Sequence, residues 1–346
     1  MLQSLRVPFM RRLFMRRTSF LVSLTLACVL VTGGDGLTAG SLRRPDLQQA
    51  LDRLVRGFNG RVGACIRDAA GAVCVNGGQR FSLQSVMKLM VGIAVMDAVD
   101  RQGWKLDDEV IVRKQDLSIG VQPIARLVTG DGYRTTIDDL VRRAIVDSDS
   151  AATDILIARL GGAQTVQAVL ARHDLPGVRV DRDERRLQTD TIGLTWKPEF
   201  VDTRVLAHAV AAVPAARRAA AFRAYQKDVR DTATPMGMVV LLHALAEGKL
   251  VSAAGTKRLL EIMEQTVTFP DRLKAGVPAG WTLGHKTGTS STWEKVTAAT
   301  NDVGILKAPD GGTVSIAVFI GDARASAIAR ASMIASIARA ATTHYQ

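Results

Sequence analysis

Phe81-Ser-Leu-Gln-Ser-Val-Met-Lys-Leu-Met-Val-Gly-Ile-Ala-Val-Met-Asp97 has a polar first half and an apolar second half with helical spacing. This pattern predicts a buried helix that begins at Ser85 or at a residue next to it. Ser85 and Lys88 then lie one turn apart on the same face. A lysine amine desolvated there can help to accept the serine proton, and the free N–H groups of the helix N-terminus can bind an acyl oxyanion. The stretch therefore indicates a serine that is acylated.

The segments outside this stretch predict one sheet and many helices. An early hairpin, with strands at about 61–67 and 72–77, is followed only near the C-terminal end by further strands, at 281–289, 298–307 and 313–321. We expect these strands to share one antiparallel sheet, with helices at both ends of the chain packed on it. Helical periods occur at about 44–58, 135–147, 163–172, 202–212, 235–247, 252–266 and 323–341.

The predicted fold class is α+β, and no Pro/Gly/Ser-rich linker divides the chain after its first 39 residues. We expect an α/β lobe from residues 40–83 and 233–346 and a mainly helical lobe from residues 84–232. Within the helical lobe, residues 173–197 are polar and show little periodicity. A long irregular stretch inside a compact domain is usually functional, so an active-site loop is predicted there.

Three further polar clusters strengthen the interpretation of Ser85, because Ser-x-x-Lys alone occurs by chance. Ser148-Asp149-Ser150 follows a predicted helix, and a hydroxyl near a lysine can relay a proton to a leaving nitrogen. Taken alone, this cluster is more typical of a helix cap.

The other two clusters could bind a substrate carboxylate and activate water. Lys286-Thr287-Gly288-Thr289 lies in a predicted strand, where the glycine allows another backbone to approach and the lysine supplies positive charge. Taken alone, it could equally be a solvated edge strand. Glu184 lies in the irregular stretch, and a carboxylate held over Ser85 could activate water to hydrolyse an acyl-enzyme. The acidic and basic residues beside it, Asp181 to Asp183, are interpreted as internal ion pairs.

Together the four clusters, in this order along the chain, resemble the class A serine β-lactamases. The resemblance covers nearly the whole chain after residue 39, and it includes three further stretches, Arg230-Asp-Thr-Ala-Thr-Pro235, Ala279-Gly-Trp281 and Ala299-Thr-Asn-Asp-Val-Gly304. It implies an antiparallel sheet covered by terminal helices beside an all-helical lobe, with the active site between them. It also implies hydrolysis of β-lactam antibiotics through a serine acyl-enzyme, and hence resistance to these compounds.

The resemblance also assigns roles to individual residues. Ser85 would be acylated, with Lys88 and Glu184 as competing candidates for the base, and Ser148 would pass a proton to the lactam nitrogen. Glu184 would then direct water onto the acyl-enzyme. The remaining assignments are an oxyanion hole from the N–H groups of Ser85 and Thr289, and a carboxylate site from Lys286, Thr287 and Thr289 in the Lys286-Thr287-Gly288 element, with assistance from Arg272.

Three positions depart from the family pattern, and two of them, Ser150 and Gln188, could change the chemistry. Where Ser150 stands, the family usually has an asparagine that binds the acylamino side chain of the substrate, and serine is shorter and offers one donor. Where Gln188 stands, the family usually has an asparagine that helps to fix the deacylating water, and one extra methylene could displace that water. The position of Arg185 often carries proline. Deacylation is therefore the step that these departures put in doubt.

Two alternatives share part of this chemistry. A penicillin-interacting D-alanyl-D-alanine peptidase has the same serine, lysine and Lys-Thr-Gly logic, but it lacks a dedicated deacylating glutamate, so Glu184 with Leu187 speaks against it. A sensor that is acylated and stalls would be a non-enzymatic outcome, and Ser150 and Gln188 motivate it. The five histidines form no ligand pair, so no metal site or cofactor is predicted, and His285 is interpreted as part of a strand.

Charge and composition bear on the expected partners of the protein. The net charge is +12, and without residues 1–39 it is +8, from 40 basic and 32 acidic residues. The Lys and Arg residues are dispersed and aromatic residues are scarce, so nucleic acid is not an expected partner. Small β-lactam molecules are the expected partners, and we expect a monomer.

The first 39 residues predict export. Four arginines between 11 and 17 precede a short apolar run from Phe20 to Val31, and Ala39 offers a cleavage site. We therefore expect a periplasmic protein without stable membrane insertion after cleavage. Arg11-Arg-Leu-Phe-Met15 resembles a twin-arginine signal, which would imply export by the twin-arginine route. Alternatives are an uncleaved anchor and lipidation at Cys28. Cys65 and Cys74 face each other in the predicted hairpin, which allows either a disulfide or two buried thiols.

Overall fold

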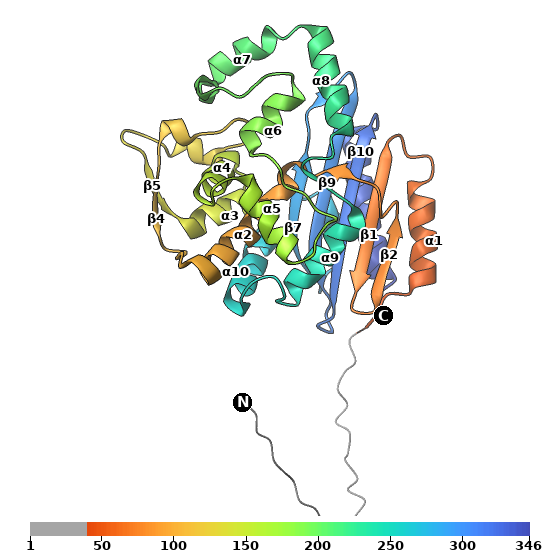
Figure 1. Ribbon diagram of the computed structural model, residues 1–346. Helices are drawn as coiled ribbons and strands as arrows, with labels where there is room; N and C mark the ends of the chain where they lie inside the picture. Colours follow the sequence, from red (N-terminus) through yellow and green to blue (C-terminus); the bar gives the residue numbers. More distant parts are fainter. Residues whose placement is uncertain (1–39) are drawn as a thin grey trace, which may run out of the picture. The chain divides into compact units, whose positions relative to one another are not determined.

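An antiparallel sheet forms one side of the molecule in the computed structural model, which describes residues 40–346 (Figure 1). Its strands follow the order β2-β1-β10-β9-β7, and β8 extends it by pairing with β9. The strands are β1 (Arg61–Asp68), β2 (Gly71–Val75), β7 (Thr282–Thr289), β8 (Thr292–Trp293), β9 (Val296–Lys307) and β10 (Thr313–Ala323). Every pairing is antiparallel, so the predicted sheet and the α+β fold class are confirmed.

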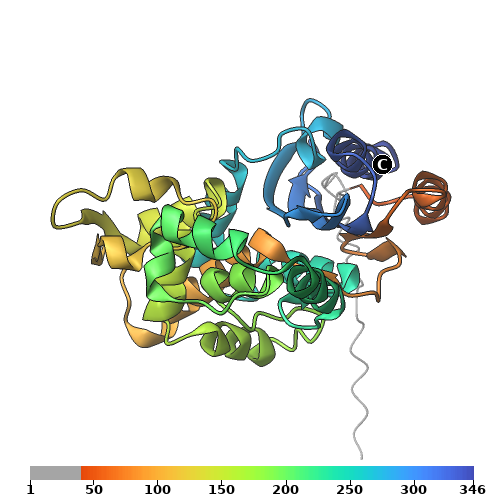
Figure 2. The ribbon, with the colours of Figure 1, turned by 90° about the horizontal axis from the view of Figure 1, so that it is seen from above.

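Helices cover both faces of this sheet, which explains why β9 and β10 are buried along almost their whole length. α1 (Arg44–Val55) and α12 (Ala327–Thr343) bury Leu47, Leu51, Ile334 and Ile337 against one face. α9 (Pro235–Ala246) packs on the other face, on the side of the helical lobe. Figure 2 shows α1 (orange) and α12 (blue) on the far side of the sheet from that lobe.

The helical lobe is built around α2 (Met87–Gln102), which is buried from Met87 to Ala98. An amphipathic helix buries one face, whereas a helix that is apolar all round lies inside a core, and α2 is of the second kind. Around it lie α3 (Ile137–Val146), α4 (Ser150–Arg159), α5 (Ala163–Arg172), α6 (Glu184–Thr191), α7 (Thr203–Ala211), α8 (Ala215–Lys227) and α10 (Ala253–Glu264). The short α11 (Leu273–Gly276) instead packs against α12. Short 3-10 turns are η1 (Gln84–Val86), η2 (Lys114–Asp116), η3 (Pro123–Arg126) and η4 (Pro198–Val201).

Several of these elements were not predicted from the sequence. Two small two-stranded sheets, β3 (Phe81–Ser82) with β6 (Thr232–Ala233) and β4 (Glu109–Val112) with β5 (Tyr133–Thr136), add to the predicted strands. They are too short for an alternating pattern to be recognised over several residues. α8 was missed because Phe222 and Tyr225 are its only buried residues, so its sequence carries no apolar stripe.

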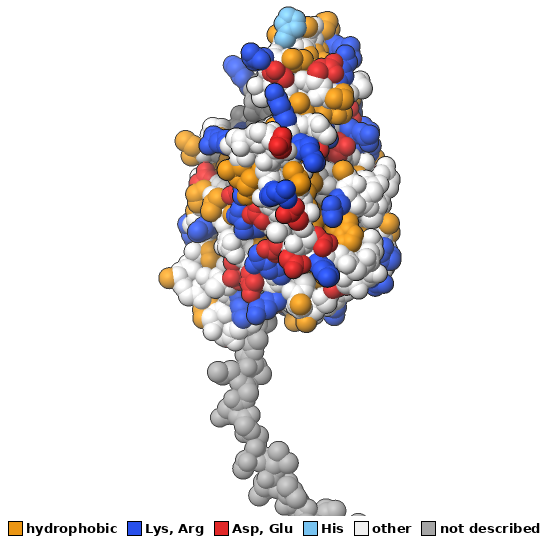
Figure 3. Space-filling view, turned by 90° about the vertical axis from the view of Figure 1, so that its left-hand side faces the viewer, with side chains coloured by type: hydrophobic (Ala, Val, Ile, Leu, Met, Phe, Trp, Pro, Cys, Tyr) orange, Lys and Arg blue, Asp and Glu red, His pale blue; other side chains and the backbone are white. Residues whose placement is uncertain are grey.

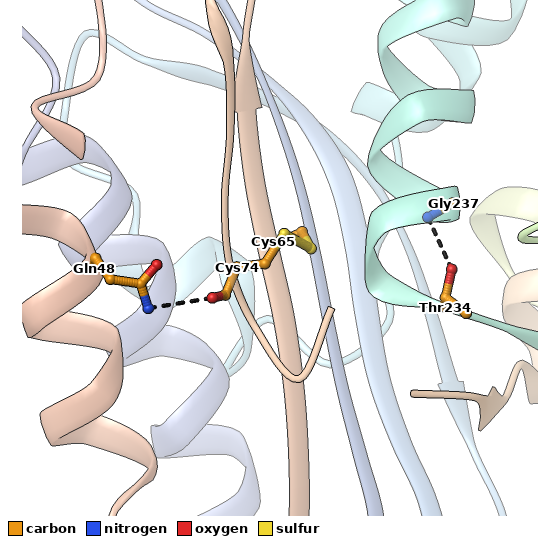
Figure 4. The surroundings of a disulfide bond; sticks show 5 residues. All are labelled: Gln48, Cys65, Cys74, Thr234 and Gly237. Atoms are coloured by element: carbon orange, nitrogen blue, oxygen red, sulfur yellow. Dashed lines mark hydrogen bonds between the residues drawn. A yellow bond between two sulfur atoms is a disulfide. The ribbon is translucent and has the colours of Figure 1, made fainter. Parts of the chain in front are cut away.

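The β1–β2 hairpin carries a disulfide between Cys65 and Cys74 (Figure 4). The two residues are direct partners in the strand register, with their Cα atoms 4.2 Å apart. On one side, Gln48 of α1 donates a hydrogen bond to the Cys74 carbonyl at 3.2 Å. The disulfide alternative is therefore confirmed, and it lies in a hairpin that is tied to α1.

Reduction of this disulfide should lower the free energy of unfolding by about 2–3 kcal/mol, because closing a loop of this length restricts the unfolded chain by about that amount. The bond joins residues nine positions apart. Urea unfolding of the same protein with and without a reductant measures the difference. Equal midpoints, with two free thiols verified by mass spectrometry in the reduced sample, would contradict it.

The surface of the helical lobe carries both signs of charge. In Figure 3, Lys and Arg side chains alternate with Asp and Glu over this face instead of gathering in one patch. Of the helices within residues 40–346, none by itself has the length and hydropathy of a membrane span, although α7 and α8 together, bent by 103°, pass on those two criteria. The predicted export signal lies outside the described residues.

Candidate active site

Ser85 lies in η1, which continues directly into α2. The residue before it, Gln84, has a left-handed backbone with φ of +48°, a conformation that costs a non-glycine residue about 1–3 kcal/mol. Asn301 of β9 compensates by donating two hydrogen bonds from Nδ2, to the carbonyls of Ser82 and Leu83 at 2.8 and 3.0 Å. The sheet thus holds the start of the helix in place, with Ser85 half-buried at its entrance.

Lys88 follows one turn later and is completely buried. Its Nζ donates hydrogen bonds to the Ser148 carbonyl at 2.5 Å and to Ser150 Oγ at 3.1 Å, and it lies 3.4 Å from Glu184 Oε1. Within residues 40–346, none of its hydrogen bonds goes to Ser85. The predicted cluster therefore converges on Lys88, which shares a helix face with Ser85.

Ser148 owes its position to a sharp break between two helices. α3 ends at Val146, and Ser148 itself is left-handed with φ of +57°. Asp149 then caps α4 by accepting a hydrogen bond from the Ala152 N–H at 2.9 Å, and its other oxygen accepts one from the Ile124 N–H at 2.7 Å. Burial raises the pKa of the Asp149 carboxyl. The cap and the projecting hydroxyl predicted for this cluster are thus both present, on adjacent residues.

Lys286 reaches the same hydroxyl from the sheet. Its Nζ donates to Ser148 Oγ at 3.0 Å and to the Thr287 carbonyl at 3.0 Å, and Lys88 Nζ lies 3.5 Å from the same Oγ. Burial, and then the nearby charge of Lys88, hold the pKa of Lys286 well below its ordinary value. A hydroxyl between two amines, one of which gives up its proton readily, can pass a proton in either direction.

Glu184 is the first residue of α6. The sequence predicts an irregular stretch over residues 173–197, and the helix corrects that prediction for residues 184–191. Asp183 caps this helix by accepting a hydrogen bond from the Arg186 N–H at 2.8 Å. The helix lacks apolar periodicity because Leu187 is its only buried apolar residue, and polar contacts hold the rest. Glu184 itself is 1% exposed.

Asp154 of α4 supports Glu184 from behind, and no sequence pattern indicates this role. Its carboxylate accepts hydrogen bonds from the Glu184 N–H at 2.7 Å and from Ser118 Oγ at 2.6 Å. Burial raises the pKa of Asp154 to about 7, and the negative charges of Asp183 and Glu184 add to the effect. Asp154 therefore connects the first residue of α6 to α4 and to Ser118 in the helical lobe.

Asp154 should make stability depend on pH between 5 and 8. In that window the unfolded carboxyl is ionised, whereas the folded one keeps its proton until near pH 7, so its contribution to stability falls as the pH rises. The fall is about 2–3 kcal/mol over this range. Urea unfolding at pH 5 and at pH 8 measures the difference in the free energy of unfolding between the two pH values. This difference should be smaller in Asp154→Asn but unchanged in Asp52→Asn, which alters an exposed carboxylate. Equal differences for wild type and Asp154→Asn would contradict the prediction.

Gln188 lies one helical turn after Glu184. Its Nε2 donates to Glu184 Oε2 at 3.2 Å and to Gln84 Oε1 at 3.0 Å. The extra methylene that distinguishes it from asparagine thus allows the amide to reach back to both side chains. Gln84 in turn donates from Nε2 to the hydroxyl of Tyr225 on α8.

The Lys286-Thr287-Gly288-Thr289 strand lies directly against the serine turn. A Cβ on Gly288 would lie 2.5 Å from the Leu83 carbonyl oxygen, so this close approach requires glycine. Thr287 Oγ1 is hydrogen-bonded to Thr268 Oγ1 at 2.6 Å. The predicted approach of another backbone at this glycine is confirmed.

Arg272 lies behind this strand and is 4% exposed. Its guanidinium donates to Thr289 Oγ1 at 2.7 Å and to the Asn301 carbonyl at 2.9 Å. Burial lowers its pKa to about 10. Arg272 therefore contacts one of the predicted carboxylate-binding residues, Thr289, rather than lying on the open surface.

Histidine, cysteine and acidic residues form no cluster of three or more suited to a metal ion in the part of the chain that the structure describes. His285 lies in β7, as predicted, and its Nδ1 is 2.9 Å from Asp302 Oδ1.

Solved structures with similar folds define the class of protein. The crystal structure of a beta-lactamase from Chitinophaga pinensis DSM 2588 has a TM-score of 0.70 and 26% identity, covering 85% of this chain and 97% of that one. The last common ancestor of Gram-negative bacteria class A beta-lactamase has a TM-score of 0.68 and 29% identity, with 86% and 98% covered. The fold is that of the class A serine β-lactamases, as predicted.

Sequence relatives agree. Beta-lactamase VEB-1 of Pseudomonas aeruginosa is 24% identical over 304 residues, which cover 87% of this chain and 90% of the relative. The extended-spectrum beta-lactamase PER-1 of the same organism is 26% identical, with 87% and 88% covered. The model of the beta-lactamase enzyme family matches residues 46–345, and the chain belongs to this family.

Proposed function

We propose that this chain hydrolyses the amide bond of β-lactam antibiotics through an acyl-enzyme on Ser85, and so confers resistance to them. The observation that carries the proposal is the position of Lys88 Nζ. It lies 3.4 Å from Glu184 Oε1 and hydrogen-bonds the Ser148 carbonyl, one helical turn from Ser85. A nucleophile, a base and a proton relay are thereby grouped around one buried amine.

In the acylation step, Ser85 Oγ attacks the lactam carbonyl carbon and gives its proton to Lys88 or, through water, to Glu184. The N–H groups of Ser85 and Thr289 bind the developing oxyanion. The C–N bond then breaks, and Ser148 passes a proton to the lactam nitrogen. The Ser148 hydroxyl lies 3.0 Å from Lys286 Nζ and 3.5 Å from Lys88 Nζ, which supports this relay.

In the deacylation step, Glu184 takes a proton from a water molecule, whose oxygen attacks the acyl carbon. The ester C–O bond then breaks, and the proton passes to Ser85 Oγ, which restores both the serine and the Glu184 carboxylate. Gln188 donates a hydrogen bond to Glu184 Oε2 at 3.2 Å, which leaves its own carbonyl oxygen to orient the water. Glu184 is fixed for this role by the hydrogen bond from its N–H to Asp154.

The substrate carboxylate is held by Lys286, Thr287 and Thr289, and Arg272 positions the Thr289 hydroxyl by its hydrogen bond at 2.7 Å. Ser150 has a changed role in this proposal. Its hydroxyl accepts a hydrogen bond from Lys88, so it contributes to placing the amine as well as lining the substrate site.

We propose further that residues 40–83 and 233–346 form the α/β lobe and residues 84–232 the helical lobe of a monomer, with the site between them. The N-terminal sequence supports export to the periplasm and cleavage after residue 39. Small β-lactam molecules are the proposed partners, and the mixed charge of the surface in Figure 3 gives no support to nucleic acid.

Mixing the purified protein with a chromogenic cephalosporin tests this function. Continuous turnover supports the hydrolase. A single burst that is stoichiometric with the protein would support the stalled sensor or the peptidase, and absence of any colour change would overturn all three.

A further inference from the structure

A series of hydrogen-bonded side chains leads away from Glu184, and beyond Gln188 its members take no part in the mechanism described so far. It runs from Gln188 on α6 to Gln84 on η1, and from there to Tyr225 on α8 and Ser82 on β3. Gln84 is 1% and Tyr225 6% exposed, so water does not replace these contacts. Gln84 and Tyr225, which are 141 positions apart in sequence, thus meet behind the proposed base.

The hydrogen bonds of this series have a single consistent direction. Gln188 Nε2 donates both of its hydrogens, to Glu184 Oε2 and to Gln84 Oε1. Gln84 Nε2 donates to the Tyr225 hydroxyl. The Tyr225 oxygen lies 2.6 Å from Ser82 Oγ, which can accept the phenol proton. Burial raises the pKa of Tyr225 to about 12, so the group remains a phenol at neutral pH.

The direction of each amide depends on its neighbour in the series. If Gln84 were reversed, its NH2 group would face the NH2 group of Gln188, and two donors would oppose each other. Gln188 would then have to reverse as well, which would turn its carbonyl oxygen toward the Glu184 carboxylate. The Glu184 carboxylate, which only accepts, sets this direction, and the Tyr225 hydroxyl supplies the acceptor that the buried Gln84 NH2 group then needs.

α8 presents Tyr225 from outside the proposed site. Phe222 and Tyr225 are the only buried residues of this helix. A cavity of about 530 Å³ lies beside Tyr225, bordered also by Asp190 and Arg217. Tyr225 is therefore one of the two side chains through which α8 is anchored to the lobe.

We propose that Tyr225 is a positioning residue for deacylation. Through Gln84 it fixes the Gln188 amide, so that the carbonyl oxygen of Gln188 and the carboxylate of Glu184 act on the same water molecule. This inference rests on the proposed function, because it assigns a role in the hydrolysis of an acyl-enzyme on Ser85. It concerns the water that Glu184 and Gln188 hold for the second step. With Lys88 as the acylation base, the first step is expected to be unaffected, because these side chains donate no hydrogen bond to Lys88, Ser148 or Lys286 among the described residues.

The test is Tyr225→Phe, which removes one hydroxyl and keeps the ring. Stopped-flow kinetics with a chromogenic cephalosporin should show deacylation slowed about tenfold to a hundredfold, because small displacements of a reacting group have effects of this size. Acylation should remain within about twofold of wild type. Intact-protein mass spectrometry should detect the accumulated acyl-enzyme. Tyr133→Phe is the matched control, because its hydroxyl accepts a hydrogen bond from Arg143 in another part of the lobe.

Repeating the substitution in a second variant, Gln188→Ala, distinguishes a positioning effect of Tyr225 from a general loss of stability. In Gln188→Ala the amide is gone, so adding Tyr225→Phe should slow deacylation no further. The inference is overturned if Tyr225→Phe deacylates at the wild-type rate, if both steps slow equally, or if its effect persists in the Gln188→Ala background. If the wild-type protein forms no acyl-enzyme, the proposed function itself has failed, whereas wild-type turnover with an unaffected Tyr225→Phe overturns only the role of Tyr225.

Discussion

Replacement of Glu184 by glutamine should leave the protein acylated on Ser85 after a single turnover. Glutamine has nearly the same size, so it fits a site where Glu184 is 1% exposed, but its amide cannot take a proton from water. General base catalysis contributes about 10²- to 10⁴-fold, so release of the acyl group should slow by that factor. Intact-protein mass spectrometry after brief mixing with a cephalosporin should show the mass of one opened lactam.

Two variants provide the controls. Ser85→Ala should carry no adduct under the same conditions, because the attacking oxygen is absent. Glu109→Gln changes an exposed carboxylate that is paired with Arg134, and it should turn over like wild type. Unchanged steady-state turnover in Glu184→Gln would refute the role given to Glu184.

The same variant distinguishes the two candidates for the acylation base. Acyl-enzyme that forms in Glu184→Gln at the wild-type rate would assign the base to Lys88. Acylation slowed in parallel with deacylation would instead assign Glu184 to both steps. The contact of 3.4 Å between Lys88 Nζ and Glu184 Oε1 allows a proton to move between them in either case.

The sequence predicted those parts of the fold and site that have a local signal. Ser85 and Lys88 were predicted because helical spacing places them on one face, and Gly288 because a strand glycine marks a close backbone approach. The sheet was predicted because its strands are long: β9 and β10 are 12 and 11 residues. In each case the signal in the sequence lies in neighbouring residues, even where the contact it predicts is with a distant segment.

The parts that were missed depend on contacts between distant segments. Asp154 was missed because no pattern in the sequence of α4 predicts a hydrogen bond from the Glu184 N–H, 30 residues further along the chain, to its carboxylate. Tyr225 was missed because α8 has almost no apolar face. Ser150 was predicted to face the substrate, yet its short side chain at the start of α4 also places its hydroxyl 3.1 Å from Lys88 Nζ. Such pairings follow from tertiary packing, which a single sequence does not encode in a readable pattern.

Lys88→Met should destabilise the fold by about 3–5 kcal/mol, which is the usual cost of leaving a buried charge without its partner. Lys88 and Glu184 are 0% and 1% exposed at their side chains, and methionine fills a similar volume without a charge. The Ser148 carbonyl would also lose its donor at 2.5 Å. Urea unfolding at pH 7 measures the change.

Adding Glu184→Gln to Lys88→Met should restore part of this stability, because the second substitution removes the charge that the first one left unpaired. The expected coupling energy is about 1–3 kcal/mol in a double-mutant cycle. Arg134 and Glu109, an ion pair with more than half of each side chain exposed, form the control cycle, with an expected coupling below about 1 kcal/mol. If the Lys88 and Glu184 effects were simply additive, the two groups would be independent in the folded protein. The amine could then not be the centre on which the nucleophile, the relay and the base converge.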